Sequence, residues 1–261
     1  MLVNMAIMTQ IICIANQKGG VGKTTTAINL AAALAVSEKN TLLIDSDPQG
    51  NATTGVGIDK NSIKKTLYHG LIGESDAKSL VLNSEIDTLK IIPSRLELIG
   101  FEVEMISSTE RETFLKKFLE DLKDSFEYII IDCPPSMSLL TVNALTASDS
   151  LLIPLQCEFY ALEGLSQLLQ TVKLIKQKLN QQLAIKGILL TMFDNRTNLS
   201  HQAAENAKKH FKNMVFETII PRNVRLGEAP SFGKPILLYD AASSGAKAYF
   251  NLAREILKKT K

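Results

Sequence analysis

The stretch from Ile11 to Thr26 constrains this chain more than any other, because it joins three local structures in a fixed order. Ile11–Ala15 is a short apolar run of the kind that forms a buried parallel strand. The segment KGGVGKTT follows at 18–25, and from Ala27 onward apolar residues recur at helical spacing. A strand, a glycine loop and a helix start in this order predict a loop that binds phosphate.

Each part of this loop has a chemical task in binding a nucleotide. Its glycines permit backbone conformations that a Cβ forbids, so successive N–H groups can converge on one anion, beside the positive end of the helix. Lys23 is expected to reach the β- and γ-phosphates, Thr24 to offer its hydroxyl to Mg²⁺, and Thr25 to bind the α-phosphate side. The predicted nucleotide-binding residues of the loop are Lys18, Gly19, Gly20, Val21, Gly22, Lys23, Thr24 and Thr25.

The loop departs from the common pattern G-x-x-x-x-G-K-[ST] at its first position, where Gln17 stands in place of glycine and Lys18 follows. KGGVGKTT resembles the deviant Walker A loop of the ParA/MinD family of ATPases. The resemblance implies that Lys18 is the signature lysine, a catalytic residue that reaches across a dimer to the partner's nucleotide. Nucleotide binding and dimerisation would then be linked. The alternative is that Lys18 is a solvated loop charge.

Length and composition fit a globular chain with a sizeable core. The chain has 261 residues, of which 45% are hydrophobic and 21% charged. Cys13, Cys133 and Cys157 lie within or beside apolar runs, which favours reduced thiols in a cytoplasmic protein over a disulfide framework. No apolar run approaches the roughly 20 residues that span a bilayer. The first sixteen residues lack the basic start and the small-residue cleavage site of a signal peptide, and residues 1–8 are expected to be a disordered N-terminus.

The alternation of apolar runs and helical patterns predicts an α/β fold of the P-loop NTPase type. We expect one domain over residues 1–261, with a mostly parallel, doubly wound sheet and helices on both faces. Residues 55–90 are expected to form short helices over one sheet edge, and 219–235 a constrained loop with one helical turn at most. Expected strands are 11–15, 41–44, 89–93, 128–132, 150–155 and 186–192, and expected later helices are 109–123, 159–179, 200–211 and 245–257.

Two carboxylates follow the second expected strand. Pro48 and Gly50 end the strand just after Asp45 and Asp47, at the end where open α/β sheets bind ligands. The segment DSDPQGNATTG at 45–55 resembles switch I of chromosomal ParA proteins of the Soj type. That resemblance implies that Asp47 is catalytic and orients the water that attacks the γ-phosphate, and that Asp45 lies near the outer shell of the metal. Either carboxylate could instead cap the following turn.

A third carboxylate ends the expected central strand at 128–132. Three isoleucines precede Asp132, which places its carboxylate at the ligand end of a buried parallel strand. Asp132 can hold the Mg²⁺ shell through water, as a Walker B aspartate does. DCPPS at 132–136 resembles the Walker B and switch II segment of the same family. The predicted metal set is Thr24, Asp132 and Asp45, whereas Cys133 is interpreted as a small core residue because no partner lies at ligand spacing.

Basic residues concentrate in the last third of the chain. Residues 180–261 hold 13 Lys and Arg against 6 Asp and Glu, whereas 1–179 hold 16 against 21. Such a basic face could meet nucleic acid or anionic lipid. IPRNVRLGEAPSFGKPI at 220–236 resembles the same segment of Soj-type proteins, which implies that Pro221 and Asn223 border the adenine. The implied DNA contacts are Arg196 and Arg225, with Arg222 and Lys247 as further candidates.

The resemblance covers about residues 9 to 257 and implies a DNA-partition ATPase that uses ATP and Mg²⁺. In such a protein ATP drives a sandwich homodimer that binds non-specific double-stranded DNA. Slow hydrolysis, in which Lys23 takes part, is stimulated by a ParB-like centromere-binding partner with a basic N-terminal segment and releases the DNA. The expected location is cytoplasmic and nucleoid-associated, with no membrane partner.

Two other classes of protein share the expected fold. A MinD-like positioning ATPase acts on a membrane or protein cargo and needs a basic amphipathic tail helix, whereas only 258–261 extend past the last expected helix. An ATP-dependent ligase or synthetase needs a dedicated substrate pocket, and the sequence shows no further cluster of histidines and carboxylates to form one.

Overall fold

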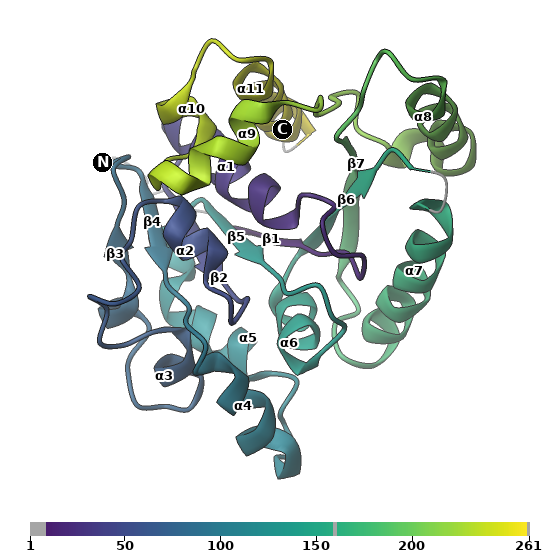
Figure 1. Ribbon diagram of the computed structural model, residues 1–261. Coiled ribbons are helices and arrows are strands. Elements are labelled where there is room, and N and C mark those ends of the chain that lie inside the picture. Colours follow the sequence, from purple (N-terminus) through teal and green to yellow (C-terminus); the bar gives the residue numbers. More distant parts are fainter. Residues whose placement is uncertain (1–8, 159–160, 260–261) are drawn as a thin grey trace, which may run out of the picture.

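The computed structural model describes residues 9–158 and 161–259. Seven strands form one sheet in the order β3-β4-β2-β5-β1-β6-β7. All pairs are parallel except the pairing of β3 with β4. Helices lie on both faces of the sheet (Figure 1), which confirms the predicted doubly wound α/β fold. The expected disorder of residues 1–8 falls outside the described residues.

The elements follow one another in alternation along the chain. The strands are β1 (Gln10–Ile14), β2 (Thr41–Asp45), β3 (Leu82–Asn83), β4 (Leu89–Ile92), β5 (Tyr128–Asp132), β6 (Ser150–Gln156) and β7 (Ala184–Thr191). The helices are α1 (Lys23–Val36), α2 (Asn51–Gly55), α3 (Leu67–Leu71), α4 (Leu98–Glu104), α5 (Phe114–Leu119), α6 (Leu139–Ala147), α7 (Ala161–Lys178), α8 (Asn198–Phe211), α9 (Val224–Glu228), α10 (Ile236–Tyr239) and α11 (Ser244–Lys259).

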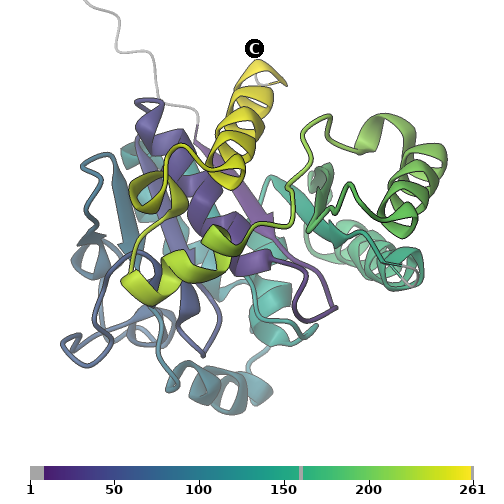
Figure 2. The ribbon, with the colours of Figure 1, turned by 45° about the horizontal axis from the view of Figure 1, so that its top comes forward.

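The core lies in two layers, one on each face of the sheet. Ile12 and Ile14 of β1 pack with the buried residues of α1 and α11, while Ile11 and Cys13 pack on the opposite side. Figure 2 shows α11 against α1 on the first face. Successive residues of a strand point to opposite faces, so a fully covered strand must be apolar throughout. This explains why β1 has no polar alternation.

The central strands bring their carboxyl ends to one edge. β5 lies between β2 and β1, and its register pairs Asp132 with Ile14 of β1 and with Asp45 of β2. All residues of β2 and β5 are buried. The glycine loop leaves β1 at this edge, so the loop and the two aspartates start from neighbouring positions.

Three local expectations differ from the structure. Helix α6 was not expected, because its residues are buried on most sides and show no amphipathic period. The helix expected at 109–123 begins only at Phe114 and continues as a 3₁₀ helix over Glu120–Ser125. The segment 219–235 contains α9 and a 3₁₀ helix (Ala229–Phe232), more than one turn, since Pro230 sits in a first turn where proline is tolerated.

A close approach of two glycines fixes this last segment against α2. Gly57 has φ 88° and Gly233 has φ 63°, in the left-handed region that favours glycine. A Cβ on Gly233 would lie 2.9 Å from the Cα of Gly57, and a Cβ on Gly57 would lie 2.9 Å from the carbonyl oxygen of Gly233. Because backbone cannot move as a side-chain tip can, neither position has room for a larger residue.

Gly233→Ala is therefore expected to lower the free energy of unfolding by about 1–3 kcal/mol, through steric overlap and an unfavourable φ. Urea denaturation followed by circular dichroism measures this loss. Gly164→Ala in α7 is the matched control, because a Cβ there meets no atom within 4 Å. The control should be as stable as the parent or slightly more so. Equal midpoints for the two variants would show that the approach is not rigid.

Candidate nucleotide-binding site

Lys23 begins α1 and is buried inside the glycine loop. Its side chain is 7% exposed, and its Nζ donates to the carbonyl oxygen of Lys18 across the loop at 3.0 Å. Burial lowers the pKa of Lys23, while the carboxylates of Asp132 and Asp47 act in the opposite direction. The loop therefore encloses a cation at the N-terminus of a helix, as phosphate binding requires.

Two polar side chains, one just after β1 and one at the end of β7, hold the loop in shape. Asn16 donates to the carbonyl oxygen of Pro154 in β6 at 2.7 Å and accepts from the backbone N–H of Lys18 at 3.0 Å. Thr191 at the end of β7 donates to the carbonyl oxygen of Val21 at 2.9 Å. No motif includes Asn16 or Thr191, and their place at strand ends is the only signal in the sequence that points to them.

Lys18 forms an ion pair within its own chain. Its Nζ lies 2.6 Å from Oε2 of Glu158, just after β6, with the two side chains 40% and 45% exposed. Gln156 donates to the other oxygen of Glu158 at 2.5 Å. A half-exposed ion pair contributes little stability and exchanges readily. Lys18 is thus not committed to the nucleotide of its own chain, and its reach to a partner's nucleotide stays a prediction.

Asp132 is a buried carboxylate without a hydrogen-bond partner. Both oxygens are shielded from solvent, and neither meets the limits of a hydrogen bond to a described residue. Burial raises the pKa of Asp132 well above its usual range, and the Asp45 carboxylate raises it further, although the nearby Thr24 side chain acts against the shift. An unpaired buried charge is costly, so this position fits a bound cation.

The surroundings of Asp132 fit Mg²⁺ better than a fully protein-ligated metal. Within residues 9–158 and 161–259, no group of three or more His, Cys, Asp or Glu could hold a metal ion. Mg²⁺ keeps several waters and is bound through one or two carboxylates plus substrate phosphates. Thr24 and Asp132 lie beside the loop, and their role in holding Mg²⁺ stays a prediction.

Asp45 holds the segment that carries Asp47. Its Oδ2 accepts from both the N–H and the hydroxyl of Thr53 at 2.7 Å, and its Oδ1 accepts from the N–H of Asp47 at 3.2 Å. Burial raises the pKa of Asp45 to about 6 despite the bonds from Thr53. The structure thus gives Asp45 the capping role, while its place in a metal shell stays a prediction. Asp47 is 7% exposed and accepts from the N–H of Gln49 at 2.9 Å.

A cavity of about 200 Å³ adjoins the loop and fits a nucleotide base. Pro221 and Asn223 line it together with Gly22 and Thr25 of the loop, as expected for residues that border an adenine. Asn223 also accepts from the N–H of Arg225 at 2.8 Å and donates to Ser244 at 2.7 Å. The lining also includes residues that no motif contains, among them Thr191, Tyr249 and Met192, the last of which has φ 51°.

The predicted DNA-contact arginines come from two adjacent segments: Arg196 lies in the loop after β7, and Arg222 and Arg225 lie just before and within α9. The backbone of Phe193 pairs with that of Ile220, and the N–H of Arg222 donates to the carbonyl oxygen of Phe193 at 2.9 Å. Arg196 is 82% exposed and donates to both oxygens of Asp194, at 2.9 and 2.7 Å. Arg225 lies 2.9 Å from Glu228 and 3.5 Å from Asp240. Both arginines are therefore neutralised within the chain.

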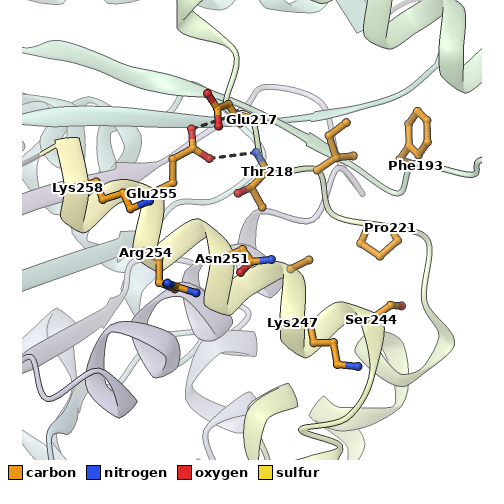
Figure 3. A pocket seen from close by; sticks show the side chains of 12 residues that line it. Phe193, Glu217, Thr218, Pro221, Ser244, Lys247, Asn251, Arg254, Glu255 and Lys258 are labelled. Atoms are coloured by element: carbon orange, nitrogen blue, oxygen red, sulfur yellow. Dashed lines mark hydrogen bonds between the residues drawn. The ribbon is translucent and has the colours of Figure 1, made fainter.

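Lys247 lies on α11, beside a groove of about 730 Å³ between this helix and residues 217–221 (Figure 3). Arg254 and Lys258 follow on the same side of the helix, seven and eleven residues after Lys247. The sequence motifs do not include Arg254 or Lys258, although their spacing along the helix is visible in the sequence. The groove extends the basic surface beyond the predicted residues.

Comparison with known proteins identifies the family. A family model described as an AAA domain matches residues 9–185. The chromosome partitioning protein ParA of Myxococcus xanthus is 55% identical over 254 residues, which cover 97% of this chain and 90% of that protein. The sporulation initiation inhibitor protein Soj of Bacillus subtilis is 55% identical over 249 residues, covering 95% and 98%. This chain belongs to the ParA/Soj-type family. It is a partition ATPase.

Solved structures of similar proteins indicate which ligands this ParA/Soj-type site binds. Cobyrinic acid a,c-diamide synthase from Mycobacterium smegmatis, with bound ADP and magnesium, is similar with a TM-score of 0.86 and 33% identity, over 97% of this chain and 96% of that one. A putative plasmid partition protein from Borrelia burgdorferi, bound to AMPPNP, is similar with a TM-score of 0.82 and 30% identity, over 96% and 99%. ATP and Mg²⁺ are the ligands of the site.

Asp132→Asn is expected to separate stability from activity. Folding raises the pKa of Asp132 from 3.8, so the carboxyl group stabilises the nucleotide-free fold while protonated and loses that contribution as the pH rises. The asparagine side chain has no such proton to lose. The free energy of unfolding of the variant, measured by urea denaturation, should therefore increasingly exceed that of the parent between about pH 4 and pH 8. Affinity for Mg²⁺-ATP should fall about 10- to 100-fold. A variant less stable than the parent at pH 8 would contradict the claim that an unpaired Asp132 carboxylate destabilises the nucleotide-free fold.

Proposed function

We propose that this partition ATPase is a nucleotide-gated DNA clamp of the cytoplasm and nucleoid. One observation carries the proposal: residues 221–225 contribute both to the nucleotide cavity, through Pro221 and Asn223, and to the basic surface, through Arg222 and Arg225. The Asn223 side chain further joins this segment to the start of α11. A nucleotide in the cavity therefore contacts the same short segment that presents arginines to solvent.

Dimerisation would follow from the position of Lys18. Its ammonium group can leave Glu158 at small cost and bind the nucleotide of a second copy, which links ATP to a sandwich homodimer. Asp47, held in place by Asp45, would orient the attacking water, and Lys23 would neutralise charge on the phosphates. Bound Mg²⁺ supplies charge neutralisation at the phosphates. Hydrolysis is slow and is accelerated by a ParB-like centromere-binding protein.

DNA binding would depend on how many cations face the duplex at once. Phosphate contacts are sequence-independent, and affinity rises steeply with their number because each releases counterions. A dimer presents Arg196, Arg222, Arg225 and Lys247 twice on one assembly, so closing the dimer doubles the number of phosphate contacts and strengthens binding. Asp194 and Glu228 compete with phosphates for Arg196 and Arg225, which keeps the affinity of a single chain low.

The membrane-positioning alternative finds less support. No helix of the described residues is long and apolar enough to cross a membrane. The apolar face of α11 packs against the core, with Tyr249, Leu252 and Ile256 all buried, so this helix does not offer that face to a lipid surface.

The synthase alternative rests on a solved structure with 33% sequence identity to this chain, whereas the partition proteins reach 55% identity.

Charge variants on the arginine loops test the DNA assignment. Titration of a fluorescein-labelled duplex with the ATP-bound protein at several salt concentrations gives affinity and salt slope. The double variant Arg196→Glu Arg225→Glu should bind the duplex at least about tenfold more weakly. The slope of log affinity against log salt concentration should become shallower by up to about 3–4, because two phosphate contacts are lost in each subunit. Asp194→Asn should tighten binding about two- to fivefold, because Arg196 is then released from its ion pair.

Asp194→Asn is the matched change in the opposite direction. Asparagine keeps the oxygen that accepts from the N–H of Arg196 at 3.0 Å but loses the charge that pairs with the arginine. Opposite effects of the two changes would support a phosphate contact. Parental affinity and slope in the arginine double variant would reject these arginines as DNA contacts. ATP affinity, measured alongside, should stay the same in both.

A further inference from the structure

The helical stretch around α4 is apolar on two opposite sides. Leu98 and Phe101 face the core and are fully buried. A second set of apolar side chains faces solvent. The exposed residues are Leu96, Ile99, Val103 and Ile106, which are 63%, 47%, 69% and 69% exposed. We refer to these four as the α4 stripe.

The spacing of the α4 stripe places its members on one side of a single helix. They are separated by three, four and three residues, which at 100° per residue confines them to about a quarter of the helix circumference. Leu96 lies in the turn that leads into α4, where the N–H of Ile99 donates to its carbonyl oxygen at 3.1 Å, and Ile106 lies in the 3₁₀ helix that follows over Met105–Ser107. A helix apolar on two sides is typical of one covered on both.

Carboxylates border the α4 stripe on both sides. By helical position Glu102 lies along one edge, and Glu97 and Glu104 lie along the other. Residues 98–107 contain no Lys or Arg. Arg95 pairs with Glu97, but Glu102 and Glu104 form no ion pair with any described residue. The surface is therefore an apolar strip between unneutralised negative charges.

We propose that the α4 stripe docks a segment of a partner protein that presents apolar side chains flanked by Lys or Arg. Apolar contact would bury the stripe, and cations at its edges would pair with Glu102 and Glu104. A second copy is a poorer occupant, because twofold contact of this face with itself brings the glutamate borders together. An anionic lipid surface is repelled by the same carboxylates.

The α4 stripe is also connected to the nucleotide site. Glu102 accepts from the N–H of Leu140 in the first turn of α6 at 3.2 Å. Residues 133–138 connect this turn to Asp132, and Thr141 of α6 donates to the carbonyl oxygen of Ser136 at 2.7 Å. A partner cation that draws Glu102 away frees the start of α6 and, with it, the loop after Asp132. This coupling rests on the proposed function, since it describes how a partner alters hydrolysis.

Fluorescein-labelled 20-residue peptides that tile the ParB-like partner in overlapping steps test the docking site. Fluorescence anisotropy with the nucleotide-free chain should identify a peptide with both apolar and basic residues. Val103→Ser with Ile106→Ser should weaken its binding about tenfold or more, and Glu102→Gln with Glu104→Gln severalfold. Leu174→Ser is the matched control, because Leu174 is a 55% exposed leucine on α7, and its effect should stay within about twofold.

Each other outcome would overturn the proposal. No binding by any peptide, or equal binding by the serine double variant and the control, excludes this surface as the docking site. Unchanged peptide binding with loss of ATP-dependent dimerisation in the serine double variant assigns the stripe to a second copy. Binding to anionic vesicles that the same variant abolishes assigns it to a membrane. Since the assay contains neither ATP nor DNA, a failure of the DNA assignment leaves its result unaffected.

Discussion

The parallel register of β1, β2 and β5 is the constraint on which the site depends. Asp132 is level with Asp45 on one side and with Ile14, the last residue before the glycine loop, on the other. A slip of one residue would turn the Asp132 side chain to the opposite face of the sheet. Because all three strands are buried on both faces, apolar packing fixes this register and thereby sets where the carboxylates meet the loop.

Charge in this chain is balanced unevenly. Lys18, Arg196 and Arg225 each have a carboxylate partner in the same chain, all at least partly exposed to water. Asp132 is fully buried, and neither oxygen of its carboxylate has a hydrogen-bond partner among the described residues. Exposed pairs exchange at little cost, whereas a buried unpaired carboxylate favours whatever cation can reach it. The arrangement suits a protein whose ligands replace internal partners, and the position of Asp132 fits a cation bound beside it.

Motifs with a local mechanism could be predicted from the sequence, and residues defined by tertiary contact could not. Lys23 and Thr24 could be located at the start of a helix, and Asp132 at the end of a buried strand, because each motif fixes its own neighbourhood along the chain, whereas their roles at the nucleotide stay predictions. Asn16 and Thr191 hold the loop only because β6 lies next to β1, and β7 next to β6, in the sheet. Helix α6 could not be predicted from the sequence, because a helix that is buried on most sides shows no amphipathic period. The α4 stripe could be found only from the exposure of its side chains in the fold, since apolar residues in a sequence are ordinarily taken as core.

Nucleotide-gated dimerisation through Lys18 is the central claim, and a measurement of molecular mass tests it most directly. Size-exclusion chromatography with light scattering would compare Asp47→Ala with Asp47→Ala Lys18→Ala, each with Mg²⁺ and ATP, with Mg²⁺ and ADP, and without nucleotide. We predict that the first variant doubles its monomer mass of 28.7 kDa with ATP only, and that the second stays monomeric in every state. A dimer without nucleotide, or an ATP-dependent dimer lacking Lys18, would contradict the claim.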